Sequence, residues 1–278
     1  MLLAIDIGNS SISLGLFDTP AVGAGLTSAL PQLELKAKIA ADPRRSADEY
    51  RITLNQLLRD GGYTPADVDA AVIGSVVPSL THSLREAVAR LCRPADGSEL
   101  PIRTVGAGTR SGLILSVDDP AQLGADIVTN AAAAVWLYGA PVVVLDFGTA
   151  TVLSCVDGSK TLLGVSILPG LQTSLDGLHG AAALLPNVEL RCPESVLGRS
   201  TADAICAGVV YGSAAMAEGL VERALREAHL PEDTPVVVTG GLAPLVLPLC
   251  RRPMHREEAL TLYGLYRVFE LTIRRERR

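Results

Sequence analysis

The chain has 278 residues, of which 48% are hydrophobic and 19% charged, and its formal net charge is −6. This length suffices for one large or two medium globular domains, and the acidic balance argues against a nucleic-acid-binding surface. The five cysteines are scattered and include no Cys-x-x-Cys pair, so they offer neither a metal site nor a disulfide framework and suit a reducing compartment.

The N-terminus lacks the basic flank and sustained apolar segment of a signal peptide. The longest apolar stretch, residues 131–145, is about 15 residues long, which is too short to span a bilayer, and Gly139 and Pro141 interrupt it. We therefore expect a cytoplasmic protein without a membrane segment. The basic tail, residues 274–278, is expected to be solvated.

The first half of the chain predicts strands alternating with helices. The apolar run 2–5, the polar turn after it and the alternating segment 12–18 predict a β-hairpin, followed by a loop over 19–31 and a strand over 33–39. Ser46 and Glu49 have the spacing of a capping box at the start of a helix. Residues 72–77 predict a buried strand and residues 80–91 a helix.

The hairpin recurs further along the chain. An offset of 140 residues places the Asp6-Ile-Gly8 segment on Asp146-Phe-Gly148 and Ile12 on Val152. Each copy combines a buried strand, an Asp-x-Gly turn and a returning strand. Such a repeat predicts two domains of related topology that face each other across a cleft, each delivering one turn to it.

The second half continues the alternation. An Ala-rich segment ending at Gly139 predicts a helix, and residues 142–145 and 163–168 predict strands around the second hairpin. A small-residue helix ending near His179, a long helix over 202–228, a strand over 236–239 and an amphipathic helix over 260–273 follow. The expected class is α/β, with mixed sheets because of the two hairpins.

The two turns have the chemistry of a phosphate site. A carboxylate at a strand end, here Asp6 or Asp146, can hold a cation directly or through water, and a glycine beside it lets backbone amides approach phosphate oxygens. Hydroxyl groups are available in both turns, from Ser10, Ser11, Thr149 and Thr151. A single Asp-x-Gly is common in ordinary turns, so the argument depends on the pair.

Three further positions allow two interpretations each. Gly240 and Gly241 follow a strand and either pass close to a nucleoside or form an ordinary turn into a helix. Asp126 is a candidate general base if burial raises its pKa, or a first-turn acid that complements the helix dipole. Thr201 either binds a ligand or caps the long helix, and capping is the simpler interpretation.

Eight motifs in order resemble those of the type III pantothenate kinases. They are Asp6–Ser10 (DxGNT), Arg45–Tyr50 (RTADEY), Ser75–Pro78 (SSVVP), Gly124–Asp126 (GADR), Asp146–Thr151 (DFGTAT), Pro169–Gly170, Gly198–Thr201 (GxST or GxNT) and Thr239–Pro244 (TGGLAP). The resemblance implies the actin-like ATPase fold, with two related ribonuclease H-like domains whose mixed sheets face a cleft. We expect an N-terminal phosphate-binding domain over 1–116. The C-terminal domain over 117–278 would carry the catalytic aspartate and the second phosphate motif, with the last helix packing back on the first domain.

The resemblance also implies an activity: ATP-dependent phosphorylation of pantothenate to 4'-phosphopantothenate, the first step of coenzyme A biosynthesis. Asp126 would be the catalytic base, Asp146 would hold a monovalent cation (K+ or NH4+), and Asp6 would hold Mg2+, directly or through water. ATP would be bound by Asp6, Ile7, Gly8, Asn9, Ser10, Ser11, Ile12, Ser13, Thr149, Gly240 and Gly241. Pantothenate would be bound by Val117, Gly124, Ala125, Asp126, Ile127 and Thr201. A homodimer with this pocket near the subunit interface is expected, without nucleic-acid or membrane partners.

Two departures from the family pattern fall in the substrate site. The family's arginine after the catalytic aspartate is Ile127 here, and a tyrosine often found nine residues before that aspartate is Val117. Loss of one charged hydrogen bond would weaken binding by about 1.5–3 kcal/mol, roughly ten- to a hundredfold in affinity. Arg103 or Arg110 could supply the cation from another loop.

Three hypotheses follow from these residues and the resemblance. The first is an active pantothenate kinase, and the second is a kinase for a different small alcohol, since the phosphate motifs are intact beside an altered pocket. The third is a non-catalytic accessory or regulatory homologue. Four residues of the expected site, Asp6, Asp126, Asp146 and Thr201, are retained, which argues against the third hypothesis because such a protein does not need the whole set.

Overall fold

The computed structural model describes residues 1–18, 30–94, 97–106, 108–182 and 184–276. Most of the loop expected over 19–31 therefore lies outside the described residues. The chain forms two compact units, each assembled from separate segments. Unit 1 contains Met1–Gly112, Asp119–Ala132 and Thr261–Arg278, and unit 2 contains Leu113–Asp118 and Ala133–Leu260. The domain boundary between residues 116 and 117 stays a prediction.

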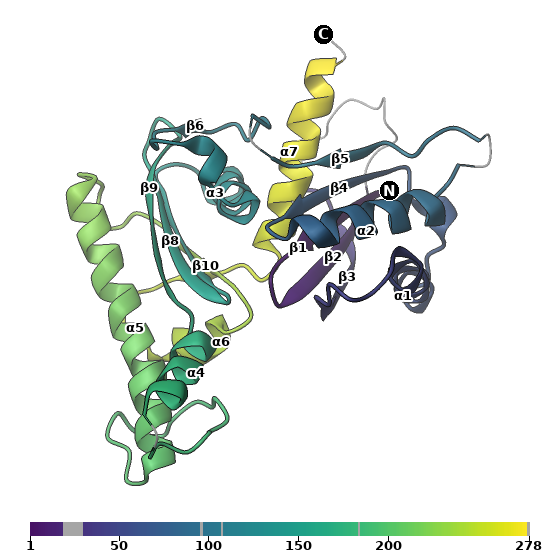
Figure 1. The fold of residues 1–278 in the computed structure, drawn as a ribbon. Coiled ribbons are helices and arrows are strands. Elements are labelled where there is room, and N and C mark those ends of the chain that lie inside the picture. The colour runs from purple at the N-terminus through teal and green to yellow at the C-terminus, as the bar shows by residue number, and fades with distance from the viewer. Residues whose placement is uncertain (19–29, 95–96, 107, 183, 277–278) are drawn as a thin grey trace. The chain divides into compact units, whose positions relative to one another are not determined.

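Unit 1 is built on a five-stranded mixed sheet with the order β3-β2-β1-β4-β5 (Figure 1). The neighbours β1–β2 and β2–β3 are antiparallel, whereas β4 pairs parallel with β1 and β5 parallel with β4. The strands are β1 (Leu2–Ile7), β2 (Ser11–Phe17), β3 (Leu33–Ala40), β4 (Ala70–Ser75) and β5 (Ile102–Thr104). The first hairpin and the strands after it are confirmed, and β5 was not predicted.

Helices cover both faces of this sheet. On one face, α1 (Ala47–Asp60) and α2 (Pro78–Leu91) pack into a continuous apolar core with β1, β2 and β4. The predicted capping box is present: the Ser46 hydroxyl accepts from the Glu49 amide, and the Glu49 carboxylate accepts from the Ser46 amide. On the other face, α7 (Leu260–Glu276) lies so close that a Cβ added at Gly74 would contact Leu265 at 2.8 Å. The final helix thus packs on the sheet of unit 1.

Unit 2 repeats this topology in a six-stranded sheet with the order β11-β10-β7-β8-β9-β6. Read from β9 to β11, the strands follow the order of unit 1 with the same parallel and antiparallel pairs, and β6 is added beside β9. The strands are β6 (Ile114–Leu115), β7 (Val142–Phe147), β8 (Ala150–Val156), β9 (Thr161–Pro169), β10 (Val236–Thr239) and β11 (His255–Arg256). The short strands β6 and β11 were not predicted.

The main helices of unit 2 are α4 (Leu171–Ala181) and α5 (Thr201–Glu227), with the short α6 (Ala243–Val246) after β10. Among the described residues, α5 alone is long and apolar enough to cross a membrane, and 44% of its most apolar window is buried within the protein. Its buried residues, including Val210, Ala217 and Val221, belong to the same core as β7, β8 and β10. A core helix has these properties as well.

One helix, α3 (Ala125–Tyr138), contributes its first two turns to unit 1 and its remainder to unit 2. Within unit 1 it packs tightly on α7. A Cβ added at Gly264 would collide with the backbone of Thr129, and the Thr261 hydroxyl donates to Asn130 Oδ1 at 2.7 Å. The described residues also include three short 3-10 turns, η1 (Pro65–Asp67), η2 (Pro120–Gln122) and η3 (Leu247–Leu249).

The two hairpins match more closely in burial than in length. The strands β1 and β7 share one burial pattern, and β2 and β8 share another. The first turn, residues 8–11, lies between the pair Ile7 and Ile12, whereas the second turn, residues 148–150, lies between Phe147 and Thr151. The second turn is one residue shorter, so matching Ile12 with Val152 is wrong: the equivalent of Ile12 is Thr151.

Candidate active site

Three backbone hydrogen bonds hold the first turn. The Gly8 amide donates to Ser11 O at 3.0 Å within the turn, and Ser10 O accepts from the Ala41 amide after β3 at 3.1 Å. The carbonyl of Ile7 accepts from the Val76 amide after β4, also at 3.1 Å. Asn9 and Ser10 are exposed at its tip. The turn therefore has a fixed shape before any ligand arrives.

The second turn is held by three equivalent bonds. The Gly148 amide donates to Ala150 O at 3.1 Å, Thr149 O accepts from the Gly170 amide at 3.1 Å, and Phe147 O accepts from the Leu242 amide at 3.2 Å. Each turn is thus fixed by three hydrogen bonds. One lies within the turn, one comes from the residue after the outer antiparallel strand (β3 or β9), and one comes from the segment after the parallel strand (β4 or β10). Preformed turns of this kind can present backbone amides to an anion without reorganisation.

Two glycines allow this close packing around the second turn. A side chain at Gly170 would collide with the carbonyl oxygens of Gly148 and Thr149, which explains why Pro169 is followed by glycine. Gly240 has φ +96°, and a Cβ there would lie 2.5 Å from backbone atoms of Phe147. Gly240 also begins the turn into α6, since its carbonyl accepts from the Ala243 amide at 3.3 Å. Gly240 therefore both begins the turn into α6 and supports the second turn. The neighbouring Gly241 is exposed.

Asp6 and Asp146 hold equivalent places in the two sheets. Asp6 pairs with Ser13 on β2 and Gly74 on β4, and Asp146 pairs with Val152 on β8 and Thr239 on β10. Each is the only half-buried residue in a strand that is otherwise buried. Among the described residues no group of three or more acidic, histidine or cysteine side chains could enclose a metal ion. A cation at either carboxylate would need further oxygen ligands from a bound molecule or the backbone.

Thr149 and Thr151 differ in their access to a ligand. Thr149 is exposed, and its carbonyl accepts from both the Gly170 amide and the Thr173 hydroxyl, the latter at 2.7 Å. Thr151 is fully buried at the place of the core residue Ile12, and its hydroxyl has no hydrogen-bond partner in the described part of the chain. Its burial argues against the expectation that the Thr151 hydroxyl is available to a phosphate.

Asp126 lies in the first turn of α3 and is half-buried. Burial raises the pKa of its carboxyl above the ordinary range, and the hydrogen bond from the Ile127 amide, 2.9 Å from Oδ1, lowers it in part. No cation among the described residues offsets the burial, so the carboxylate has an increased affinity for a proton. This is the property of a general base, and it favours that interpretation over a first-turn acid placed only for the helix dipole.

Contacts within unit 1 connect Asp126 with the first turn. Gly124 packs directly against the Asp126 carboxylate, and a Cβ at Gly124 would also lie 3.5 Å from Val76 Cγ1. The Val76 amide in turn donates to Ile7 O at the base of the first turn. The structure thus brings the candidate base, the Ser75–Pro78 motif and the Asp6–Ser10 motif into one continuous arrangement.

The remaining positions expected around the substrate are divided between the units. Ile127 is 8% exposed and Ala125 half-buried, both in unit 1, whereas Val117 is half-buried in unit 2. Arg103 and Arg110, the candidate substitutes for the missing arginine, line a cavity of unit 1 together. Neither Asp126 nor Ile127 is among the residues that line this cavity.

Thr201 does not cap α5. The N-cap is Ser200, whose hydroxyl accepts from the Asp203 amide at 3.1 Å and donates to the Asp203 carboxylate at 2.7 Å. Arg191 forms an ion pair with the same carboxylate. Thr201 is the exposed first residue of the helix, so the capping interpretation is wrong and the ligand-binding interpretation remains.

Lys38 is a candidate site residue that the sequence analysis missed. It pairs with Ser13 on β2, and Ser13 pairs with Asp6 on β1. Paired residues share a face of the sheet, so the three side chains form a row, with Lys38 about 9.5 Å from Asp6 at two strand spacings. Lys38 is exposed, and its side chain makes no hydrogen bond or ion pair within the described residues. The alternation of lysines with apolar residues in β3 is the signal that could have revealed it.

Solved structures of similar topology define the class of protein. A putative Baf family transcriptional activator from Campylobacter jejuni matches with a TM-score of 0.55 and 16% identity, over 97% of this chain and 98% of that one. An activator of 2-hydroxyisocaproyl-CoA dehydratase from Clostridium difficile, solved with bound ADPNP, matches with a TM-score of 0.55 and 12% identity, over 100% and 97%. At this identity they show the fold alone, which is the actin-like ATPase fold.

Sequence relatives identify the family within that class. Residues 2–223 match the sequence profile of the type III pantothenate kinases. Type III pantothenate kinases from Shouchella clausii and Streptomyces avermitilis are each 38% identical to this chain, over 97% and 99% of its length and 99% and 100% of theirs. One from Roseiflexus sp. is 39% identical over 98% of this chain and 99% of its own. The chain belongs to the type III pantothenate kinase family.

Proposed function

We propose that the protein transfers the γ-phosphoryl group of ATP to the primary hydroxyl of pantothenate, giving 4'-phosphopantothenate for coenzyme A biosynthesis. The observation that carries this proposal is the arrangement in unit 1. There the Asp126 carboxyl, whose pKa is raised, is connected through Val76 to the preformed turn that follows Asp6 and begins at Gly8. The names of the relatives supply the substrate.

Asp126 acts as the base in this proposal. Its Oδ atoms accept the proton of the substrate hydroxyl as the oxygen attacks phosphorus, while the Ile127 amide keeps the carboxylate oriented. The two turns contribute positioning and charge stabilisation, which make up most of phosphoryl-transfer catalysis. The ATP-contacting residues are those predicted above, residues 6–13, Thr149, Gly240 and Gly241, with Lys38 added.

The cation ligands follow from the donor set. Asp6 and Asp146 are hard oxygen ligands of the kind that Mg2+ and K+ prefer, and with one carboxylate each they suit ions that also coordinate phosphate oxygens. Mg2+ would neutralise charge on the transferred group. Thr149 O already accepts two hydrogen bonds, which fill its lone pairs. We therefore assign the monovalent cation to Asp146 rather than to this carbonyl.

Val117, Gly124, Ala125, Asp126, Ile127 and Thr201 are the residues proposed to bind pantothenate. The protein is further proposed to be a cytoplasmic homodimer without nucleic-acid or membrane partners. The exposed positions of α5, among them Ala204, Gly208 and Ala215, would allow a second helix to approach closely.

A kinase for a different small alcohol is the second candidate function. It is favoured by Ile127, whose buried side chain stands where the family has an arginine. Without that cation the pocket loses an anchor for a carboxylate, whereas both phosphate turns remain complete.

A coupled assay of ADP release separates these two functions. With ATP, Mg2+ and K+, we expect turnover that requires pantothenate and falls when Na+ replaces K+, as the resemblance to the family implies. If ATP binds but pantothenate does not stimulate turnover, whereas another alcohol does, the second function is correct. Equal rates in K+ and Na+ would contradict the monovalent site at Asp146.

Lys38 gives a prediction specific to the nucleotide. We expect Lys38→Met to raise KM for ATP about tenfold to a hundredfold, because a charged hydrogen bond to phosphate contributes about 1.5–3 kcal/mol. KM for pantothenate should stay unchanged. The matched control is Lys36→Met, on the same strand and face but paired with Gly15, two residues further from the turn. Equal effects of the two substitutions would mean that only the general charge of β3 matters.

A further inference from the structure

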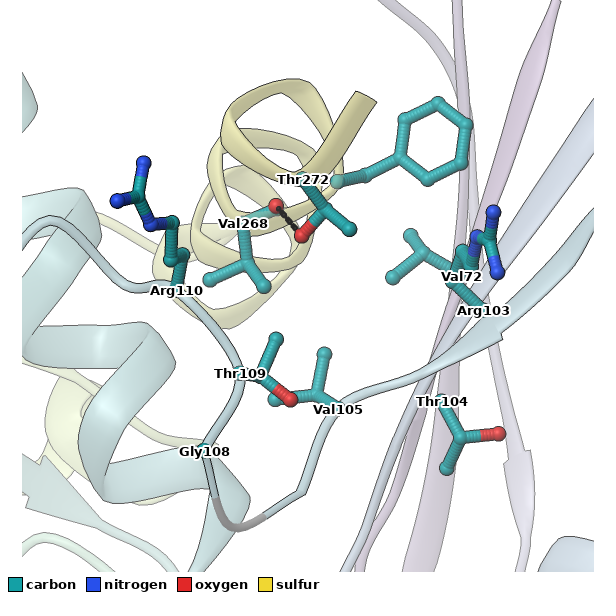
Figure 2. A pocket seen from close by; sticks show the side chains of 10 residues that line it. Val72, Arg103, Thr104, Val105, Gly108, Thr109, Arg110, Val268 and Thr272 are labelled. Carbon is teal, nitrogen blue, oxygen red and sulfur yellow. Dashed lines mark hydrogen bonds between the residues drawn. The ribbon is translucent and has the colours of Figure 1, made fainter. Parts of the chain in front are cut away.

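Unit 1 contains a cavity of about 250 Å³ that none of the roles above uses. It lies on the face of the sheet that α7 covers, beside β4 and β5. It is lined by β4 (Val72), β5 and the segment after it (Arg103, Thr104, Val105, Gly108, Thr109, Arg110), and α7 (Val268, Phe269, Thr272). Figure 2 shows Arg103 and Arg110 on opposite sides of it, with Val268 and Thr272 between them.

The cavity combines an apolar floor with a cationic rim. Val72, Val105 and Val268 are buried, whereas both arginines are exposed. Arg110 forms no ion pair with any described residue, and no acidic side chain is among the residues that line the cavity. In a chain with a net charge of −6, a hollow that holds the guanidinium group of Arg110 and is lined by no carboxylate selects for an anion.

The segment after β5 has a defined shape. The Gly106 amide donates to the Thr109 hydroxyl at 2.9 Å, and the Thr109 amide donates to Gly106 O at 3.1 Å. The Val105 amide donates to Ile73 O at 2.8 Å, which ties the segment to β4. On the α7 side of the cavity, the Thr272 hydroxyl donates to Val268 O within the helix at 2.8 Å. The Thr109 hydroxyl still has a hydrogen to offer to a ligand.

Size and chemistry together define the ligand class. A volume of about 250 Å³ is below the range of about 300–1,000 Å³ typical of drug-sized ligands, so the cavity suits a small metabolite better than a nucleotide. The apolar floor suits a short aliphatic body. Because no helix N-terminus, the usual device for phosphate, lines the cavity, a carboxylate is the better headgroup.

The cavity is also connected to Asp126. The α7 residues that line it continue the helix whose first turns hold α3, through Gly264 against Thr129 and through the bond from Thr261 to Asn130. Asp126 lies one turn before Thr129 on α3. A ligand that contacts Val268 and Thr272 therefore acts on the helix that fixes the position of α3.

We propose that this cavity binds the carboxylate of a small aliphatic organic acid, with Arg110 at the headgroup, and that its occupancy is transmitted through α7 to α3. The acid is either the proposed substrate itself, through its carboxylate end, or a separate metabolite. The binding does not depend on the proposed kinase activity, because the cavity and the catalytic residues are formed by different side chains.

The test is a titration of the 15N-labelled full chain with isovalerate, followed through backbone amide shifts. A ligand of this size is expected to bind with a Kd on the order of 1 mM. We expect shifts at Val105, Thr109 and Thr272, and smaller shifts over residues 126–130. Isovaleramide, which has the same shape without charge, should cause none. A parallel titration with pantothenate identifies the source: the same shifts mean that the substrate carboxylate occupies the cavity, and their absence means a separate acid.

Two variants complete the test. Arg110→Gln should weaken isovalerate binding at least about tenfold. Arg59→Gln, an exposed arginine of α1 on the opposite face of the sheet, should leave it unchanged. Equal binding by wild type and both variants, or shifts confined to other parts of the chain, would overturn the proposal. So would isovaleramide binding as well as isovalerate, because the guanidinium would then have no role.

Discussion

Asp126→Asn is expected to lower kcat of pantothenate-dependent ADP release by about 10²- to 10⁴-fold, the usual contribution of a general base. The amide keeps the shape of the side chain, and its oxygen can still accept from the Ile127 amide, so α3 should begin as before. ATP affinity should not change. Steady-state kinetics and a nucleotide-binding titration on the same preparation measure both quantities.

Stability distinguishes a catalytic role of Asp126 from a structural one. Burial raises the pKa of its carboxyl in the folded chain, so ionisation lowers the free energy of unfolding as pH rises from the ordinary pKa, 3.8, through the raised value. Asparagine carries no charge to bury. Asp126→Asn should therefore unfold at the same or a higher temperature at neutral pH. A variant that loses both activity and several degrees of Tm would instead point to a structural role.

The same pKa sets the pH dependence of the wild-type enzyme. The base must be deprotonated to act, so kcat/KM should rise with pH through the raised pKa of Asp126, and the acid limb should lie above the ordinary value of 3.8. The control for the variant is Asp118→Asn, an exposed carboxylate nearby in the sequence. It should leave kcat and the acid limb in place.

The sequence predicted the features that depend on local pattern. Period-2 and period-3.6 alternation located both hairpins, and the spacing of Ser46 and Glu49 located the start of α1. The repeat at an offset of 140 identified Asp6 and Asp146 as equivalent, and their strand pairings agree. The shorter second turn was missed because the two Asp-x-Gly segments match at the offset of 140, and the same offset was carried on into the returning strands.

Features that depend on contacts distant in the sequence were not predictable in this way. The row from Asp6 to Lys38 requires the pairing of three strands, and the cavity beside Arg110 combines residues from β4, β5 and α7. Thr201 was taken for the cap because serine and threonine are equally good caps, and only the backbone of Ser200 decides between neighbours. The raised pKa of Asp126 depends on how far its side chain is buried. The Ala-rich pattern of α3 indicated apolar surroundings but not the extent of burial.

Gly240→Ala is expected to lower the free energy of unfolding by about 2–5 kcal/mol and to abolish detectable ATP binding. A left-handed φ of +96° costs a side chain about 1–2 kcal/mol, and forced overlap in a packed place costs about 1–3 kcal/mol more. The overlap is with backbone atoms of Phe147 at 2.5 Å, which cannot rotate away. The second turn would have to move, and Gly148 and Thr149 would move with it.

Gly139→Ala is the matched control for this substitution. Gly139 lies in the same unit with φ +86°, but nothing lies within 4 Å of a Cβ added there. The control should lose only the backbone term, about 1–2 kcal/mol, and retain ATP affinity. Urea denaturation of both variants measures the free energy of unfolding, and a nucleotide titration measures ATP affinity. The difference between the variants separates the cost of a side chain at positive φ from the cost of the overlap with Phe147. If Gly240→Ala behaves like Gly139→Ala in both measurements, Gly240 serves only the turn into α6. If only Gly240→Ala loses ATP binding, its contact with Phe147 holds the second turn in the shape that binds phosphate.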